Sequence, residues 1–544
     1  MKITKRLLLA VLALCASGLA ASAQDKPNVL FLLSDDHSYP YLSCYGDTNV
    51  KTPALDQLAA EGMKFHRFFT AAPQCVPSRA SLLTGRSPVA ARITRFSSPL
   101  PRDVETFPEV MRQKVGYFVG VCGRAYHLDG ADIGGLVTKN NLKTFTERFD
   151  YVRTGSDEAT TTQMSEFLEK KPKDKPFFLW VNFSDPHHVW NAPASFRPDP
   201  ASLKLPPHFP DLPGMRSQLA DYCAEVNRVD TSVARILKLL ADKGLDKNTI
   251  VVFCGDNGQA LPHGKGSLYD PGLNVPFLVR WPGVVKPGGE SRALLSGEDL
   301  APTILSAVGL AVSPQISGVS FLPLLKGEAF TPRKQLFAER GPHGSAPVTV
   351  GMKNSGYDLS RCVRTDRYKF IYNATPWIPY GPVDSAGGAA WREITEANAA
   401  GKLTAGLITT YFTAPRPVYE LYDLDTDPSE LTNLSGKPEL ASVEKALRLA
   451  LAEKMTVDFD YLPLPDLGDA TPAKANANAP NNRAAQFKRL DTNGDGKLSK
   501  AEFSAGREPK EAGNWFLQRD TNNDGFISRE EFLPATPNPK PPKQ

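Results

Sequence analysis

Four short apolar segments, each followed by polar and charged residues, limit what this chain can fold into more than any other feature. They are residues 29–33, 117–122, 176–183 and 249–254. Continuous apolar runs of this length are typical of strands that are buried on both faces of a parallel sheet. Between the third and fourth segments, apolar residues at helical spacing predict a long helix over about residues 216–240. We therefore predict an α/β fold built on one central sheet.

The residues that follow these segments are candidates for one shared site. They are, in chain order, Asp35, Asp36, Arg124, His127, His187, Asp256 and Asn257. Open α/β sheets bind ligands at the carboxyl ends of their strands. Adjacent carboxylates repel each other unless a cation lies between them, and a ligand set made only of oxygen favours Ca²⁺ or Mg²⁺ over zinc. We predict such a cation among Asp35, Asp36, Asp256 and Asn257.

A cysteine motif lies between the first and second segments. Cys75 precedes a proline by two residues and Arg79 by four, and residues 80–86 continue as Ala-Ser-Leu-Leu-Thr-Gly-Arg. The pattern predicts a loop that leads into a helix capped by Ser78, whose N-terminus would favour an anion beside Cys75. Arg79, Arg124 and Lys265 add fixed positive charge, and His127 and His187 can carry protons near neutral pH.

Residues 75–86 resemble the signature of the sulfatase family, C-x-P-S-R-x-x-L-L-T-G-R, and the resemblance extends over about residues 27–460. Asp35-Asp36 and Asp256-Asn257 match the family's two metal-binding motifs, and Asp185-Pro186-His187 matches its D-P-H motif. Residues 123–127 resemble the family's G-K-x-x-H motif, with Arg124 in place of the lysine. The sequence looks most similar to the heparan N-sulfatase and iduronate-sulfatase members. The resemblance implies an alkaline-phosphatase-like α/β/α sandwich with a smaller C-terminal antiparallel subdomain.

The resemblance also implies a mechanism. Cys75 is expected to be converted to formylglycine by a formylglycine-generating or anaerobic sulfatase-maturating enzyme, and the resulting nucleophile is expected to bind the metal. Arg79 and Lys265 would hold the sulfate oxygens, and Asp256 would accept the nucleophile's proton. His187, with Lys265, would protonate the departing sugar oxygen or nitrogen, and His127 would assist the later release of sulfate. The implied substrate is a sulfated carbohydrate, cleaved at a sulfate ester or a sulfamate.

Two other functions fit the sequence. Tetrahedral oxyanions differ little in size, so a phosphatase or phosphonate hydrolase of the same superfamily is one alternative. A catalytically silent calcium- or carbohydrate-binding protein, with Cys75 left unmodified, is the other. Three further residues, expected in loops, are candidates for binding an anionic sugar: Arg95, Arg340 and His343.

The C-terminal third has a different pattern. Residues 363–372 alternate as one antiparallel strand does, residues 420–424 predict a second strand, and a closing helix is expected near residues 441–456. We predict a catalytic α/β domain over residues 24–335 and a C-terminal subdomain over residues 336–465. Residues 466–482 are rich in Ala, Asn and Pro and predict a flexible linker.

Two calcium-binding loops of the EF-hand type are predicted within residues 483–535, followed by a disordered tail over residues 536–544. Their ligand positions 1, 3, 5, 7, 9 and 12 are occupied by Asp491, Asn493, Asp495, Lys497, Ser499 and Glu502 and by Asp520, Asn522, Asp524, Phe526, Ser528 and Glu531. Phe487, Leu490, Phe503, Phe516 and Phe532 are expected to form their shared core.

The N-terminus predicts export. Residues 1–23 combine basic residues, an apolar run and a small-residue cleavage site, which is typical of a signal peptide. We therefore expect a periplasmic or secreted protein. The apolar run is too short for a membrane span. The net charge of +4 gives no bulk attraction to nucleic acid.

Overall fold

The computed structural model describes residues 26–94, 99–124, 143–343, 358–462, 483–505 and 516–532. The chain divides into two compact units, Met1–Leu464 and Pro465–Gln544. Within the described residues, no helix has the length and apolar character needed to cross a bilayer. The predicted signal peptide, linker and tail, together with Arg95 and His127, lie outside the described residues. The domain boundaries given above stay predictions.

The first unit is built on an eight-stranded sheet with the order β5-β4-β6-β1-β7-β8-β2-β9. Its four adjacent strands β4 (Phe118–Gly123), β6 (Phe177–Asn182), β1 (Asn28–Ser34) and β7 (Thr249–Gly255) are parallel and correspond to the four predicted segments. Leu33 of β1 pairs with Asn182 on one side and with Cys254 on the other. The carboxyl ends of these strands are therefore level with one another.

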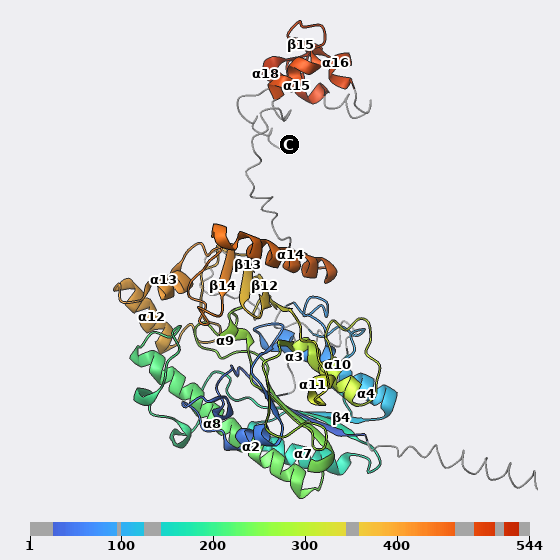
Figure 1. Ribbon diagram of the computed structural model, residues 1–544, viewed down its shortest axis with the longest axis vertical. Coiled ribbons are helices and arrows are strands. Elements are labelled where there is room, and N and C mark those ends of the chain that lie inside the picture. Colours follow the sequence, from blue (N-terminus) through green and yellow to red (C-terminus); the bar gives the residue numbers. More distant parts are fainter. Residues whose placement is uncertain are drawn as a thin grey trace, which may run out of the picture. The chain divides into compact units, whose positions relative to one another are not determined.

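Helices cover both faces of this sheet (Figure 1). Val29, Phe31 and Leu33 of β1 pack in the core that contains α3 (Cys75–Thr84), α4 (Phe107–Val115) and α10 (Leu300–Ala307). Leu30 and Leu32 pack in the opposite core with α2 (Pro53–Glu61), α7 (Thr160–Lys170) and α8 (Pro213–Asp242). Burial of both faces explains the uninterrupted apolar runs. The predicted α/β/α sandwich is confirmed.

The remaining strands extend the sheet at its two ends. At one end, β5 (Tyr151–Val152) is the edge strand and is parallel to β4. At the other end β8 (Phe277–Arg280) is antiparallel to β7 and is followed by β2 (Met63–Phe65) and β9 (Gly289–Ser291). The site lies away from these additions, at the four parallel strands.

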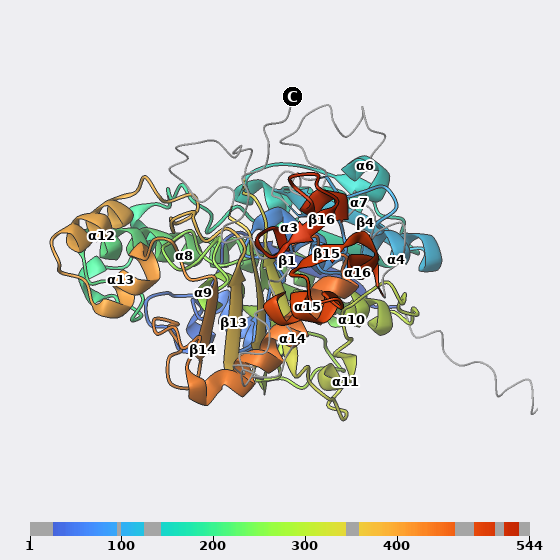
Figure 2. The same ribbon diagram turned by 90° about the horizontal axis from the view of Figure 1, so that it is seen from above.

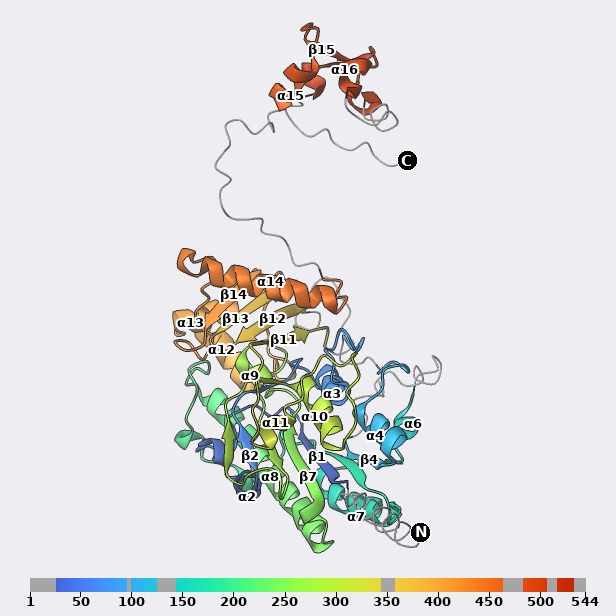
Figure 3. The same cartoon turned by 45° about the vertical axis from the view of Figure 1, so that its right-hand side comes forward.

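A four-stranded antiparallel sheet forms the C-terminal part of this unit, in the order β11-β12-β13-β14. Its strands are β11 (Gln335–Arg340), β12 (Ser360–Thr365), β13 (Tyr368–Asn373) and β14 (Tyr419–Asp423). The helix α14 (Ala441–Val457) lies across it (Figure 3) and contributes Leu447, Leu451 and Met455 to the core on that face. The expected antiparallel subdomain and its closing helix are confirmed.

One strand assignment was wrong. Residues 363–372 form parts of two strands, because the chain turns between Thr365 and Tyr368 and returns antiparallel as β13. The polar residues Thr365, Asp366 and Arg367 lie at this turn, and a single strand over 363–372 left their interruption of the apolar pattern out of account. Between β13 and β14 the chain forms α12 (Ala389–Ala399) and α13 (Ala405–Phe412), which lie beside α8 (Figure 2) and share its core.

The second unit contains two similar loop-and-helix segments. The first comprises α15 (Arg483–Leu490), β15 (Lys497–Ser499) and α16 (Lys500–Ser504), and the second comprises β16 (Phe526–Ser528) and α18 (Arg529–Phe532). The strands β15 and β16 pair antiparallel through Leu498 and Ile527. These two residues join the five predicted apolar residues in one small core.

Candidate active site

Three carboxylates and an amide meet where β1 and β7 end. Asp35, Asp36, Asp256 and Asn257 are fully buried. The backbone N–H of Asp36 donates to Asp256 Oδ1 at 2.9 Å, and Asn257 Nδ2 donates to Asp36 Oδ1 at 2.8 Å. The parallel register of the two strands places these residues side by side although more than two hundred positions separate them. The four predicted metal ligands therefore form one cluster.

Cys75 points at this cluster from the first turn of α3. Its Sγ lies 3.4 Å from Asp35 Oδ1 and 3.8 Å from Asp36 Oδ1. The prediction that Ser78 caps the helix was wrong, because the helix begins at Cys75 and Gln74 is the extended residue before it. The Ser78 hydroxyl instead donates to the backbone carbonyl of Asp256. This bond joins α3 to the end of β7 and so helps to aim Cys75.

Two arginines hold the carboxylates in place. Arg79 Nε donates to Asp256 Oδ2 at 2.8 Å, and the Arg79 guanidinium also lies 2.9 Å from Asp35 Oδ2. Arg124 follows β4 and lies 2.8 Å from Asp35 Oδ2. The preceding Gly123 has φ of 75°, and a Cβ there would lie 1.9 Å from the carbonyl oxygen of Asn182. Glycine is therefore required for the chain to bring Arg124 to the site.

Lys265 is the third cation of the site. Its Nζ lies 2.9 Å from Asp36 Oδ1 and 2.7 Å from Asp384 Oδ2, and its side chain is almost completely buried. Burial alone would lower the pKa of Lys265, but the carboxylates around it raise that pKa well above its ordinary value. Lys265 therefore stays charged.

The residues present fit a hard divalent cation. Burial raises the pKa of Asp36 to about 7, although Lys265 opposes this, and burial together with Asp35 raises the pKa of Asp256 to about 6. Among the described residues, the buried Oδ1 of Asn257 has no hydrogen-bond partner. Donor atoms of Asp35, Asp36, Cys75 and His187 lie within 4.8 Å of one another. A divalent ion would offset the repulsion among the buried carboxylates and would give Asn257 Oδ1 a partner.

The thiol of Cys75 is not activated in this environment. Burial raises its pKa well above the ordinary value, and the neighbouring carboxylates Asp35 and Asp256 raise it further. A reactive cysteine needs a lowered pKa, because the thiolate is the nucleophile. The side chain is therefore placed as a nucleophile would be, but its sulfur is held in the neutral form.

His187 lies at the solvent side of the cluster. Its Nε2 is 3.8 Å from Asp36 Oδ2 and 3.8 Å from Asp384 Oδ2. Burial and the charge of Lys265 lower the pKa of His187 to about 4. The side chain of Asp185 does not join the site, because both of its oxygens accept hydrogen bonds from Arg228 of α8 at 2.7 Å. That pair anchors the turn that presents His187.

An open cleft begins beside His187 and Arg124. Its volume is about 400 Å³, and Asp185, Glu225 and Arg228 form part of its wall. Arg228 donates to both of these carboxylates. The cleft therefore has a polar, charge-paired wall directly next to the cluster.

Asp384 is a site residue that sequence reasoning missed. It comes from the segment between β13 and α12 in the C-terminal part of the unit. No motif surrounds it, and its partner Lys265 lies more than one hundred residues earlier. Two supporting residues were missed for the same reason. Arg228 donates to Asp185, and Asn182 Oδ1 accepts a hydrogen bond from Arg79 at 3.1 Å. A periodic pattern or short motif cannot report such pairings.

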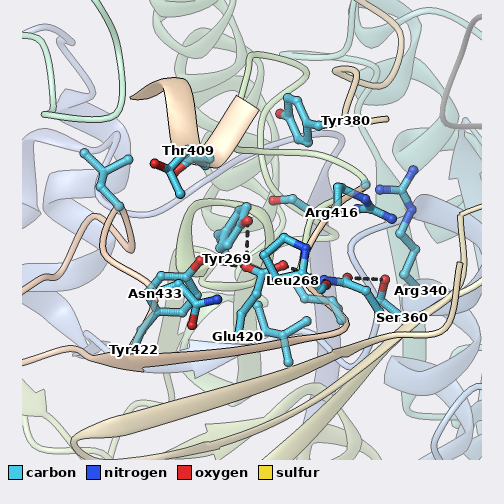
Figure 4. Close-up of a pocket in the computed structure, with 17 residues that line it drawn as sticks. Leu268, Tyr269, Arg340, Ser360, Tyr380, Thr409, Arg416, Glu420, Tyr422 and Asn433 are labelled. Carbon is cyan, nitrogen blue, oxygen red and sulfur yellow. Dashed lines mark hydrogen bonds between the residues drawn. The ribbon is translucent and has the colours of Figure 1, made fainter. Parts of the chain in front are cut away.

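Two of the candidate sugar-binding residues, Arg340 and His343, lie in the part of the chain that the structure describes. Arg340 is the last residue of β11 rather than part of an open loop, is 3% exposed, and pairs with Asp358 at 3.0 Å. Figure 4 shows Arg340 and Arg416 facing an internal pocket that Tyr269 and Glu420 also line. Burial and Lys265 lower the pKa of His343 to about 3. A substrate-binding role for either residue stays a prediction.

The EF-hand loops of the second unit have side-chain oxygens turned inward. Asp491 accepts hydrogen bonds from the backbone N–H groups of Asp495 and Gly496, and Asp520 does the same for Asp524 and Gly525. Gly496 and Gly525 have φ of 79° and 85°, which the sharp turn at loop position 6 requires. Carboxylates at positions 1, 5 and 12 of each loop fit Ca²⁺.

Comparison with known proteins places this site in a family. The sequence matches a family model described as Sulfatase over residues 27–310 and one described as N-sulphoglucosamine sulphohydrolase, C-terminal, over residues 262–377. EF-hand matches cover residues 483–505 and 514–533. An ulvan-active sulfatase of Formosa agariphila is 28% identical over 456 residues, which cover 81% of this chain and 82% of the relative. Human N-sulphoglucosamine sulphohydrolase is 28% identical over 495 residues, which cover 82% of this chain and 92% of the relative.

Solved structures share the fold. A protein in complex with its substrate D-glucosamine-2-N,6-O-disulfate has a TM-score of 0.58 and 21% identity, over 80% of this chain and 99% of that one. A phosphonate monoester hydrolase from Silicibacter pomeroyi has a TM-score of 0.61 and 22% identity, over 80% of this chain and 96% of that one. At these identities the two structures establish the fold alone. The Sulfatase match, however, spans just over half of the sequence and includes the cysteine motif and both acidic pairs. The chain therefore belongs to the sulfatase family and is a sulfuric ester hydrolase.

Proposed function

We propose that this sulfatase is exported and removes sulfate from a sulfated carbohydrate, as an ester or a sulfamate. The observation that carries the proposal is the position of Cys75, within 3.8 Å of two buried carboxylates at the ends of parallel strands. The names of the relatives support the substrate class, since they include an ulvan-active sulfatase and an N-sulphoglucosamine sulphohydrolase. The signal-peptide pattern of residues 1–23 supports a periplasmic or secreted location.

Asp35, Asp36, Asp256, Asn257 and residue 75 would hold Ca²⁺, with Mg²⁺ as the alternative. When bound, the ion supplies charge stabilisation to the sulfuryl group and to an oxygen nucleophile. Conversion of Cys75 to formylglycine by a maturation enzyme would supply that oxygen. The neutral, buried state of the thiol supports a role for Cys75 as the precursor rather than as the nucleophile itself.

The surrounding side chains have separate tasks in this proposal. Arg79 fixes Asp35 and Asp256, and Arg124 and Lys265 present positive charge to the sulfate oxygens. Asp256 accepts the nucleophile's proton. His187, at the start of the cleft, donates a proton to the leaving oxygen or nitrogen with the help of Lys265. His127, which lies outside the described residues, is proposed to assist sulfate release.

Mass spectrometry tests the nucleophile. In the tryptic peptide containing residue 75, conversion of the thiol to an aldehyde lowers the mass by roughly 18 Da. Cys75→Ala should lower turnover of an aryl sulfate by roughly 10⁴-fold or more, with an unchanged circular dichroism spectrum. An active preparation with only unmodified Cys75, or substantial turnover by the variant, would refute this mechanism.

Parallel assays test the alternatives. Faster turnover of an aryl phosphate or phosphonate monoester than of an aryl sulfate would favour the alternative that the protein is a phosphatase or phosphonate hydrolase. No turnover of any ester, with residue 75 still an unmodified cysteine, would favour a silent binding protein. Desulfation of sulfated glycosaminoglycan and algal oligosaccharides, measured by released sulfate, then identifies the substrate. Detection of the processed protein in the periplasm or medium tests export.

The second unit is proposed to bind Ca²⁺ at both EF-hand loops. Stability, tethering and calcium sensing are its three candidate roles. Exported proteins meet high calcium concentrations, so permanently filled sites of low affinity are favoured over sensing ones. Calorimetric titration of the whole protein with Ca²⁺, compared with the Asp491→Ala variant, tests whether the first loop binds.

A further inference from the structure

Asp384 lies against Lys265 and is the more exposed of the two side chains. Its Oδ2 is 2.7 Å from Lys265 Nζ and 3.8 Å from His187 Nε2. The Asp384 side chain is 25% exposed, whereas the Lys265 side chain is 1% exposed. An anion that binds to Lys265 Nζ must therefore come close to the Asp384 carboxylate.

The position of Asp384 is fixed by the fold. Its backbone has φ of 66°, in the left-handed region, where Asp and Asn are among the few residues with side chains that are tolerated. The preceding Val383 packs against Gly266, since a Cβ on Gly266 would lie 2.2 Å from a methyl carbon of Val383. Gly266 is the neighbour of Lys265 in the chain. The loop is thus packed directly against the segment that carries the lysine.

The charges of the site show what this carboxylate changes. Among the described residues, the charged groups of the site are the acids Asp35, Asp36, Asp256 and Asp384 and the bases Arg79, Arg124 and Lys265. The histidines of the site are left out of this sum, because the carboxylates, the arginines and the lysine already fix the difference that Asp384 makes. With a divalent cation bound, the total is one positive charge. Without Asp384 it would be two.

The ligands of such a site differ in charge. A sulfate ester or a sulfamate carries one negative charge, but the sulfate ion released by hydrolysis carries two. A phosphate monoester also carries two above about pH 6. We propose that Asp384 is a specificity-determining residue that matches the site to a monoanionic ester and repels dianions, namely the sulfate product and phosphate monoesters. This inference rests on the proposed function.

The size of the effect follows from Coulomb's law. One additional charge on the ligand, a few ångströms from a fixed carboxylate near a protein surface, changes binding by about tenfold or more. Lys265 attracts both kinds of ligand, so Asp384 reduces the attraction most for the ligand with the greater charge. The residue would thereby both assist product release and select sulfate esters over phosphate esters.

The test compares ligands of different charge on Asp384→Asn. Asparagine keeps the shape, tolerates the left-handed backbone and can still accept a hydrogen bond from Lys265. At pH 8, the inhibition constant for inorganic sulfate should fall by about tenfold. The ratio of kcat/KM for an aryl phosphate to that for an aryl sulfate should rise by a similar factor. The rise in melting temperature caused by inorganic sulfate should also be larger than in the parent protein.

Two further variants serve as controls. Asp384→Glu keeps the charge, so its sulfate inhibition and phosphate-to-sulfate ratio should remain those of the parent. Glu158→Gln removes an equal charge from an exposed residue of the cleft wall. It should leave the ratio within about twofold, because solvent screens exposed charges.

Unchanged or weaker sulfate binding by folded Asp384→Asn, with an unchanged ratio, would overturn the inference. If that variant does not fold, Asp384→Gly, which relieves the backbone, replaces it, and failure of both would assign Asp384 a structural role and also overturn the inference. Failure of the proposed function looks different, because the parent protein would then not hydrolyse aryl sulfates at all, while sulfate binding could still be read from melting temperatures.

Discussion

The active site and the EF-hand pair both gather acidic side chains, but they do so in opposite ways. The active site takes its charged residues from positions between Asp35 and Asp384 and buries most of them. Each EF-hand loop takes its ligands from one short stretch, such as Asp491 to Glu502, and leaves half of them exposed. The first arrangement depends on the sheet, whereas the second depends on the turn chemistry of a few adjacent residues.

The difference has an energetic consequence. Buried charges need partners, and the carboxylates of the active site are held by arginines and a lysine that come from other elements. In the EF-hand loops, carboxylates such as Asp491 are satisfied by backbone N–H groups of the same loop. Removal of one charged group should therefore have large, far-reaching effects in the first unit and small, local effects in the second.

The largest expected effect is on catalysis. Asp256→Asn removes the charge that pairs with Arg79 and one carboxylate of the proposed ion site. We expect kcat/KM for an aryl sulfate to fall on the order of 10³-fold. In the matched variant Asp491→Ala, turnover should stay within about twofold while calorimetry shows weaker Ca²⁺ binding by the first loop. Retention of most activity by Asp256→Asn would contradict the role given to the buried cluster.

The next effect is on stability. Lys369 of β13 is fully buried and lies 2.6 Å from Asp270 and 2.7 Å from Glu430. Lys369→Ala leaves both acids without this partner and should cost roughly 3–5 kcal/mol in the free energy of unfolding, measured in urea. Lys238→Ala breaks an exposed pair with Asp242 and should cost less than about 0.5 kcal/mol. Equal costs would remove the distinction between buried and exposed charge.

The two units should lose stability at different acidic pH values. Burial lowers the pKa of His208 to about 3, so the unfolded chain binds more protons than the folded one between about pH 6.5 and pH 3, and stability falls as the pH falls through this window. His208→Phe keeps a ring against His263 and should reduce the loss of stability between pH 7 and pH 5 by about 2 kcal/mol. Denaturation curves at the two pH values measure this.

The second unit should respond at lower pH. Residues 465–544 contain no histidine, and hydrogen bonds from Ser499 lower the pKa of Glu502 to about 2. A carboxylate with a lowered pKa contributes stability above the ordinary pKa of about 4.5, and this contribution is lost as the pH falls towards 2. Loss of EF-hand structure at pH 6, before the first unit changes, would contradict this order.

The smallest expected effect comes from removal of the whole second unit. Deletion of residues 483–544 should leave turnover of an aryl sulfate within about twofold, because the two ligand sets share no residue and the units are separately compact. Kinetics on the purified shorter chain test this. A loss of tenfold or more would show that the EF-hand pair supports catalysis.

Sequence patterns predicted the parts of both regions that are encoded locally. The four parallel strands, the closing helix α14 and the apolar core of the second unit agree with the sequence. The predictions failed where a local signal was ambiguous. Ser78 is a favoured capping residue but bonds to Asp256 instead, and the single strand predicted over residues 363–372 contains a turn at its polar residues 365–367. Leu498 and Ile527 were missed because they lie inside polar loops.

The sequence by itself placed the candidate site residues at the strand ends and indicated both EF-hand loops, because strand length, apolar period and loop spacing are local properties of a chain. Only the tertiary structure decided that Asp384 pairs with Lys265, that Arg228 anchors the turn before His187, and that Arg340 is buried. These pairings join residues from separate elements. Packing of the whole sheet and its helices, rather than any neighbouring residue in the chain, brings them within hydrogen-bonding distance.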